Sequence, residues 1–126
     1  MKTILVVDDE VDIVEAVAEF LVGEGYRVVS AGNGTDALAQ LEKANPTLVL
    51  TDSIMPVTDG PGFVRRMRAL SPFRSLPVVL MSASRENGTP SLGTDGVSAV
   101  LNKPFGLDEL LAVIQRLIGK GEPGTG

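Results

Sequence analysis

A short apolar run in the middle of the chain, Thr47-Leu48-Val49-Leu50-Thr51-Asp52, limits the folds open to it. Three aliphatic residues between threonines indicate a strand buried on both faces, because such a strand loses the alternation of apolar and polar residues. Asp52 stands at the carboxyl end of this strand, and open α/β sheets bind ligands outside the carboxyl ends of their strands. We therefore expect Asp52 to take part in chemistry. The alternative is an aspartate that only caps a turn.

Strands and helices are predicted to alternate along the chain. Apolar runs predict further strands over residues 4–7, 27–30, 77–82 and 99–102. Apolar residues at helical spacing predict helices over residues 11–22, 34–44, 60–70 and 106–118. This alternation predicts a doubly wound α/β domain over residues 1–118, with a parallel sheet and right-handed crossovers, followed by a flexible tail over residues 119–126.

The composition excludes several kinds of site. The 126 residues include neither Cys nor His, so disulfides, zinc sites and histidine-based catalysis are excluded. A net charge of −5 without a basic run argues against nucleic-acid binding. No apolar run approaches the ~20 residues of a membrane-spanning helix, and the first residues carry no signal-peptide pattern. We therefore expect a cytoplasmic protein that does not contact a membrane.

Charged and hydroxyl side chains follow four of the five predicted strands. These residues are Asp8, Asp9, Asp52, Ser82 and Lys103. Because the carboxyl ends of parallel strands meet at one edge of a sheet, we expect these side chains to lie close together. Three carboxylates would repel one another unless a divalent cation and the ammonium neutralise them. Magnesium is the expected cation, because it prefers hard oxygen ligands.

Four motifs, taken in their order along the chain, resemble those of the receiver domain of two-component response regulators, which has the CheY-like fold. The motifs are Asp8-Asp9, Asp52 with Met55-Pro56 and Asp59-Gly60, Ser82-Ala83, and Lys103-Pro104-Phe105. The resemblance covers residues 3–118 and implies a flavodoxin-like (βα)5 fold whose five parallel strands have the order 2-1-3-4-5. The family's fourth helix would fall at Arg85–Gly96, which is rich in glycine and contains a proline. Mid-helix glycine costs about 1 kcal/mol and proline about 3 kcal/mol, so we expect a degenerate helix, a loop or one short turn, there.

The resemblance implies a phosphoryl acceptor and a magnesium site. Asp52 would accept a phosphoryl group from a sensor histidine kinase or a phosphotransfer protein. Asp9 would bind Mg²⁺ directly, Asp8 mainly through water, and the carbonyl of Ile54 would complete the protein ligands together with Asp52. Ile54 is apolar where polar residues are common in the family, which would slow dephosphorylation by hindering the attacking water.

The resemblance also implies roles for residues around the acceptor. Lys103 and the Ser82 hydroxyl would contact the phosphoryl oxygens, and the Lys103–Pro104 bond would be cis. An apolar patch would dock the kinase, formed by Ile13, Ala16, Pro104 and Phe105. Val100 replaces the aromatic residue that usually reports phosphorylation in this family, so switching is expected to run instead through ordering of residues 85–96.

Three functions are compatible with these motifs. The first is a phosphorylated signalling module with an output partner or domain that the sequence does not identify. The second is a receiver-shaped interaction module that signals without phosphate. The third is a metal-dependent phosphatase with Asp52 as its nucleophile, which is disfavoured because Ile54 stands where a second acid would be needed. We therefore predict a signalling domain and not an enzyme.

Overall fold

The computed structural model describes residues 2–52, 60–70, 73–82 and 97–121, and within them it places five strands and four helices. The strands are β1 (Thr3–Val7), β2 (Arg27–Ala31), β3 (Leu48–Asp52), β4 (Val78–Ser82) and β5 (Ala99–Asn102). The helices are α1 (Val11–Gly23), α2 (Gly34–Ala44), α3 (Gly60–Arg68) and α4 (Leu107–Ile118). The segment Arg85–Gly96, where a degenerate helix was predicted, lies outside the described residues.

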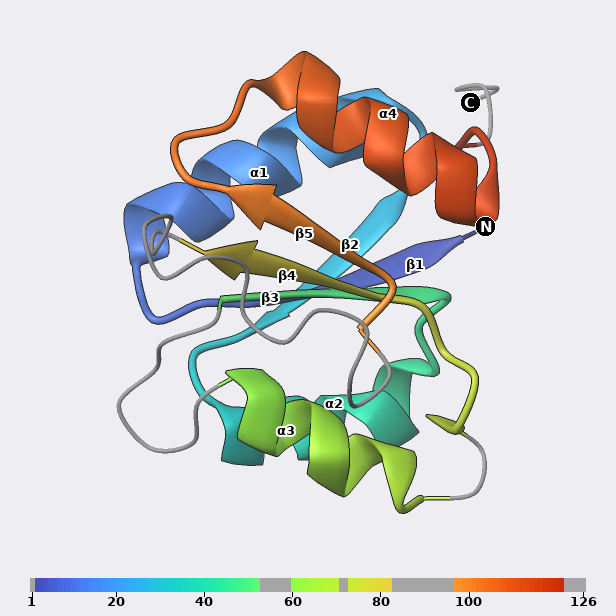
Figure 1. The fold of residues 1–126 in the computed structure, drawn as a ribbon. Coiled ribbons are helices and arrows are strands. Elements are labelled where there is room, and N and C mark those ends of the chain that lie inside the picture. The colour runs from blue at the N-terminus through green and yellow to red at the C-terminus, as the bar shows by residue number, and fades with distance from the viewer. Residues whose placement is uncertain (1, 53–59, 71–72, 83–96, 122–126) are drawn as a thin grey trace.

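The five strands form one parallel sheet in the order β2-β1-β3-β4-β5, which confirms the predicted topology. Helices α1 and α4 cover one face of the sheet, and α2 and α3 cover the other (Figure 1). Every residue of β1, β3 and β4 is buried, because these strands lie inside the sheet and both faces are covered. Their burial explains the continuous apolar runs in the sequence.

Alternate residues of a strand contribute to two separate core clusters. In β3, Leu48 and Leu50 pack with residues of α1 and α4, whereas Val49 packs with residues of α2 and α3. Successive side chains of a strand point to opposite faces, so Thr51 lies on the face of Val49 and Asp52 on the face of Leu50. This alternation decides which side of the sheet the Asp52 carboxylate faces.

Helix α3 ends two residues before the predicted boundary, at Arg68 instead of residue 70. After Arg68 the hydrogen bonds span three residues instead of four: the Leu70 amide donates to the Met67 carbonyl at 2.9 Å, and the Phe73 amide donates to the Leu70 carbonyl at 2.9 Å. The Arg68 guanidinium donates to the Phe73 carbonyl at 2.7 Å, which links the end of α3 to Phe73. The predicted bounds of α2 and β5 agree with the structure.

The three residues that follow α4 contact the amino-terminal part of the chain, near β1 and the start of β2. The Tyr26 hydroxyl donates to the Gly119 carbonyl at 2.7 Å, and the Lys2 ammonium donates to the Lys120 carbonyl at 2.9 Å. Gly121 is packed so closely against the turn before β2 that a Cβ atom would lie 2.4 Å from a backbone oxygen. The predicted tail therefore begins with three residues in contact with the domain, and residues 122–126 lie outside the described part. Across the described ranges, the helices are too short or too polar to cross a membrane.

Candidate functional site

The carboxyl ends of four strands bring the predicted site residues to one edge of the sheet. Asp8 and Asp9 follow β1, Asp52 ends β3, Ser82 ends β4, and Lys103 follows β5. Asp8, Asp52 and Ser82 are each less than a tenth exposed, whereas Asp9 is exposed. Two buried carboxylates and an exposed one at this edge suit a cation or a charged ligand better than they suit packing.

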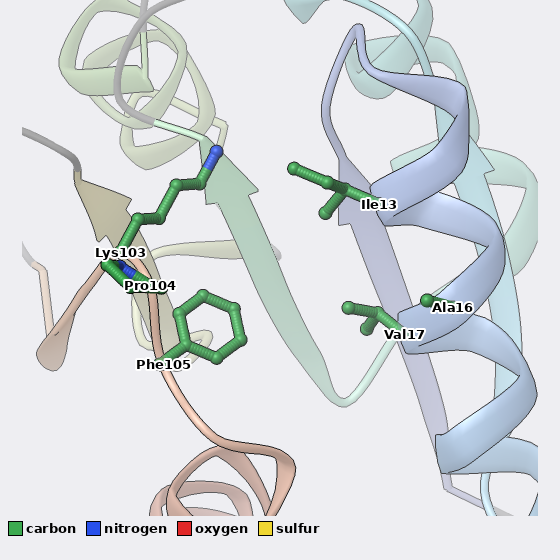
Figure 2. A pocket seen from close by; sticks show the side chains of 6 residues that line it. All are labelled: Ile13, Ala16, Val17, Lys103, Pro104 and Phe105. Carbon is green, nitrogen blue, oxygen red and sulfur yellow. The ribbon is translucent and has the colours of Figure 1, made fainter.

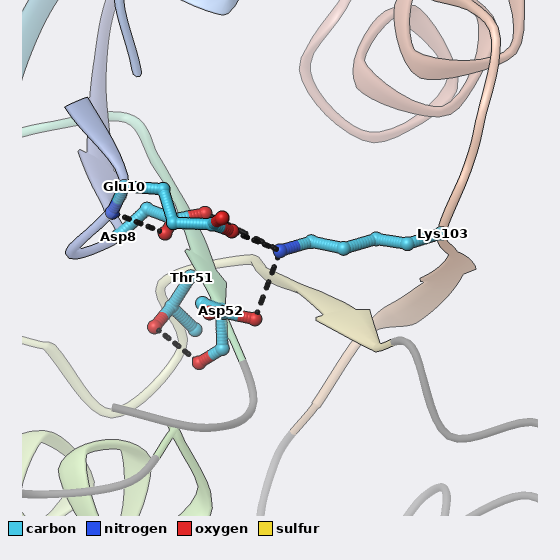
Figure 3. A network of polar contacts seen from close by, with 5 residues as sticks. All are labelled: Asp8, Glu10, Thr51, Asp52 and Lys103. Carbon is cyan, nitrogen blue, oxygen red and sulfur yellow. Dashed lines mark hydrogen bonds and ion pairs between the residues drawn. The ribbon is translucent and has the colours of Figure 1, made fainter. Parts of the chain in front are cut away.

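Lys103 supplies the positive charge of this edge. Its ammonium nitrogen lies 3.2 Å from Asp52 Oδ1, 3.5 Å from Asp8 Oδ2 and 3.8 Å from Glu10 Oε1 (Figure 3). The backbone fixes the start of this side chain, because the Lys103 amide donates to the Ser82 carbonyl at 2.7 Å. The peptide bond between Lys103 and Pro104 is cis, which confirms the prediction from the resemblance.

Burial and the neighbouring charges shift two pKa values at this edge. Burial raises the pKa of Asp8, and the nearby Asp52 carboxylate raises it further, while the Glu10 backbone amide and Lys103 oppose the shift. Burial by itself would lower the pKa of Lys103, but Asp52 and Asp8 together outweigh it and raise that pKa. Lys103 therefore stays charged at neutral pH, and ionisation of the Asp8 carboxyl group costs free energy in the folded protein.

The three aspartates also form a possible metal site. Ligand oxygens of Asp8, Asp9 and Asp52 all lie within 4.8 Å of one another. A cluster of carboxylate oxygens with one ammonium beside it retains net negative charge, and hard oxygens are the ligands that Mg²⁺ prefers. The donor set therefore fits Mg²⁺. Ile54, the fourth predicted ligand, lies outside the described residues.

Two residues at this edge were not predicted as part of the site. Glu10 lies near Lys103, and its amide donates to Asp8 Oδ1 at 2.9 Å, which fixes the turn into α1. The Thr51 hydroxyl donates to the Asp52 carbonyl oxygen at 3.1 Å. The sequence held a signal for each, because Glu10 continues the acidic run that follows β1 and Thr51 is a polar residue inside a buried strand.

An apolar pocket of about 470 Å³ opens beside the carboxylates. Figure 2 shows side chains of α1 on one side and the residues after β5 on the other. Its lining residues are Ile13, Ala16, Val17, Lys103, Pro104 and Phe105. All four residues of the predicted docking patch line it. Lys103 belongs both to the pocket and to the carboxylate cluster, so a partner in the pocket would lie next to Asp52.

Comparison with known proteins places the chain among response regulators. The family model described as the response regulator receiver domain matches residues 4–115. The chain is 38% identical over 125 residues to the response regulator Rre1 of Synechocystis, covering 98% of this chain and 54% of Rre1. It is 32% identical over 124 residues to the phosphate regulon transcriptional regulatory protein PhoB of Pseudomonas aeruginosa, and the match covers 98% of this chain and 54% of PhoB. The chain thus spans about half the length of these curated relatives.

Solved structures agree with this placement. The chemotaxis protein CheY4 of Vibrio cholerae is 31% identical with a TM-score of 0.86, and the match covers 94% of this chain and 99% of CheY4. The receiver domain of the sensor histidine kinase PA1611 of Pseudomonas aeruginosa, whose structure has a magnesium ion coordinated in its active site cleft, is 30% identical with a TM-score of 0.80, covering 94% and 98%. These similarities support signalling by phosphorylation and do not favour a phosphate-independent module. With its fold, its carboxylate edge and its family match in agreement, the chain belongs to the response regulator receiver domains of two-component systems.

Proposed function

We propose that Asp52 accepts a phosphoryl group from a sensor histidine kinase or a phosphotransfer protein. The observation that carries this proposal is the position of the Asp52 carboxylate, which lies 3.2 Å from the Lys103 ammonium among three clustered carboxylates. In the transfer, an Asp52 oxygen attacks phosphorus and the phosphorus–nitrogen bond of the donor phosphohistidine breaks. The electron pair of that bond stays on the imidazole, which takes up a proton from water.

The residues around Asp52 lower the electrostatic barrier to this attack. A carboxylate and a phosphoryl group are both negative, so their approach needs positive charge held in place beforehand. Lys103 supplies one such charge, because it is already within hydrogen-bonding distance of Asp52. Ser82, at the buried end of β4, would donate its hydroxyl to a phosphoryl oxygen once Asp52 is modified.

We also propose that the carboxylate cluster holds Mg²⁺. Asp9 and Asp52 would bind the ion directly, Asp8 mainly through water, and the Ile54 carbonyl would be the remaining protein ligand. The bound ion would supply positive charge to the phosphoryl oxygens. The clustering of the three carboxylates within 4.8 Å supports this assignment, as does the magnesium ion in the related PA1611 receiver domain.

The donor protein is proposed to dock in the apolar pocket between α1 and the residues after β5. The pocket lies next to Asp52 through their common neighbour Lys103, and its lining is otherwise apolar. A helix that carries the donor histidine would bury an apolar face there. Such a donor implies a cytoplasmic location. Phosphorylation would then switch contacts with an output domain or a separate partner, and the chain would not turn over a substrate of its own.

The test is phosphorylation by acetyl phosphate, a small-molecule donor that needs no docking surface. The wild-type chain should gain one phosphoryl group in the presence of Mg²⁺ and none when EDTA is present, as read by intact-protein mass spectrometry. Asp52→Asn should gain none under either condition. Asp36→Asn, which removes a carboxylate at the start of α2, is the matched control and should react like wild type. Modification of Asp52→Asn at the wild-type rate would contradict the proposal.

A further inference from the structure

Glu10 carries a carboxylate at the acceptor edge that neither the metal site nor the start of α1 uses. The carboxylates that cluster within 4.8 Å are those of Asp8, Asp9 and Asp52. Glu10 stands at the N-cap position of α1, but its side chain makes no capping hydrogen bond among the described residues. The backbone holds this turn instead, because the Glu10 amide donates to Asp8 Oδ1 at 2.9 Å and the Glu10 carbonyl accepts from the Val14 amide at 3.1 Å.

The Glu10 carboxylate contacts Lys103. Its Oε1 lies 3.8 Å from Lys103 Nζ, which is too long for a hydrogen bond, so the two groups attract each other by charge alone. Asp52 Oδ1 and Asp8 Oδ2 lie closer to the same nitrogen, at 3.2 Å and 3.5 Å. Figure 3 shows the three carboxylates around the end of the Lys103 side chain. Glu10 therefore shares the cation that a phosphoryl group on Asp52 would need.

Glu10 lies on the solvent side of this group of charges. Its side chain is 60% exposed, whereas those of Asp52 and Asp8 are 10% and 0% exposed. A phosphate compound that comes from solvent therefore meets the Glu10 charge before it reaches Asp52. Asp9 is exposed as well, but it is proposed to bind the metal, which offsets its charge.

The charges of the proposed metal and of Lys103 do not balance those of the carboxylates. A divalent ion and one ammonium offset three carboxylates, and Glu10 is the fourth at this edge. Its charge remains in excess when the donor arrives, and the donor brings negative charge of its own. Electrostatic repulsion of this kind lowers the rate at which an anion reaches a site.

We propose that Glu10 is a specificity-determining residue, whose charge slows phosphorylation by small anionic donors and thereby favours a protein-borne phosphohistidine. A small anion such as acetyl phosphate has little besides its charge to hold it at the edge. A protein donor gains its affinity in the apolar pocket, whose lining does not include Glu10. Specificity of this kind comes from repulsion of the wrong partner. The inference rests on the proposed function, because it concerns the same acceptor.

The test varies the charge at residue 10 and measures labelling by acetyl phosphate, in which an Asp52 oxygen attacks phosphorus and acetate leaves. Initial rates are measured at low ionic strength and at saturating Mg²⁺, the concentration being chosen for each variant by isothermal titration calorimetry. A unit charge beside a reacting group at an exposed position changes such a rate by about threefold. Glu10→Gln should therefore react about threefold faster than wild type, and Glu10→Lys about tenfold faster. Glu10→Asp, which keeps the charge, should stay close to wild type.

The dependence on salt separates charge from structure. At about 1 M salt the screening length falls to roughly 3 Å, so all four proteins should react at similar rates. Glu42→Gln, in the last turn of α2, removes the same net charge from an exposed position on the other face of the sheet. This control should react like wild type at every salt concentration. Transfer from a purified, autophosphorylated kinase domain should change less in Glu10→Gln than labelling by acetyl phosphate does.

Three results would overturn the inference. The first is labelling of Glu10→Gln and Glu10→Lys by acetyl phosphate at or below the wild-type rate in low salt. The second is an acceleration that high salt leaves unchanged, because charge would then not be its cause. The third is an equal acceleration with acetyl phosphate and with the kinase domain, since Glu10 would then not discriminate between donors. A wild-type chain that takes no phosphoryl group would instead overturn the proposed function, and the role of Glu10 with it.

Discussion

Lys103 Nζ lies 3.2 Å from Asp52 Oδ1, although 51 positions of sequence separate the two residues. The same ammonium lies 3.5 Å from Asp8 Oδ2, so one cation links the end of β5 to the ends of β3 and β1. The contact depends on the sheet order, in which β4 separates β3 from β5. A long side chain is needed to cross that strand.

Lys103→Met should slow phosphorylation by acetyl phosphate strongly. Methionine keeps much of the apolar length but removes the charge, and loss of one group that stabilises developing negative charge typically costs about 100-fold in rate. Initial rates from intact-protein mass spectrometry measure the effect at saturating Mg²⁺. Lys43→Met, on α2, removes a lysine away from the site and should have no effect. A wild-type rate for Lys103→Met would show that the ammonium is not needed.

Asp8→Asn should stabilise the metal-free protein at neutral pH. Burial, with the charge of Asp52 adding to it, raises the pKa of Asp8 above its ordinary value of 3.8. A raised folded-state pKa gives stability that is present below pH 3.8 and is lost as the pH rises through the folded-state value. Asparagine avoids that loss and can still accept the Glu10 amide. We expect a gain of about 1 kcal/mol in the free energy of unfolding at neutral pH, which shrinks as the pH falls toward the ordinary value.

Urea unfolding in EDTA, followed by circular dichroism, measures this difference. Glu15→Gln, on the exposed surface of α1, is the control and should change stability little. Added Mg²⁺ should stabilise wild type more than Asp8→Asn. An Asp8→Asn protein that is less stable than wild type in EDTA would mean that the carboxylate is favourable even without metal.

The sheet and its carboxyl edge could be predicted from the sequence, because strands buried on both faces appear in the sequence as continuous apolar runs. The β3 run indicated a strand covered on both faces, and its last residue, Asp52, lies at the carboxyl edge of the sheet as predicted. The predicted end of α3 was wrong, since the hydrogen bonds of Leu70 and Arg68 that follow the helix have no counterpart in helical periodicity. The predictions for Ile54 and for switching through Arg85–Gly96 fall outside the described residues.

Side-chain contacts between distant positions could not be predicted from the sequence. Glu10 reaches Lys103 only because the Asp8 turn directs it there, and the Tyr26 hydroxyl meets the Gly119 carbonyl across 93 positions. Such contacts depend on rotamers and on how helices end, and neither has a periodic signature. The family resemblance supplied the cis bond after Lys103, which the residues alone do not indicate.

Ala16→Glu should slow phosphoryl transfer from a histidine kinase and leave acetyl phosphate labelling unchanged. Ala16 is exposed and lines the apolar pocket, so a charge there would be buried against the donor helix. Substitution at the centre of an interface commonly costs more than 1 kcal/mol, so a rate loss of roughly tenfold is expected at limiting receiver concentration. The donor is a purified, autophosphorylated kinase domain that labels wild type.

Ala39→Glu, on the exposed side of α2, is the matched control for this change and should transfer normally. If Ala16→Glu slowed labelling by acetyl phosphate as well, the pocket would serve the structure of the acceptor site and not the docking of a partner.

Tyr26→Phe should destabilise the domain by about 1 kcal/mol at neutral pH, because it removes the partly buried hydrogen bond to the Gly119 carbonyl. Burial raises the pKa of Tyr26 above its ordinary value of 10.0. A raised folded-state pKa gives stability that is present below pH 10.0 and is lost as the pH rises through the folded-state value. The advantage of wild type over Tyr26→Phe should therefore shrink in alkaline solution. Tyr26 is the only tyrosine of the chain, so urea unfolding of the two proteins isolates its titration. If the difference in free energy of unfolding between the two proteins stayed the same from neutral to alkaline pH, the hydroxyl would not titrate as argued.

The position of the phosphoryl group tests the central claim most directly. An acyl phosphate is reduced by borohydride to an alcohol, which marks the modified side chain permanently for peptide mass spectrometry. After labelling with acetyl phosphate and Mg²⁺, the account predicts reduction at residue 52, as homoserine, in the wild-type chain and no reduced residue in Asp52→Asn. Reduction at Asp8 or Asp9, or a phosphoryl group on Ser82 with Asp52 unmodified, would contradict it.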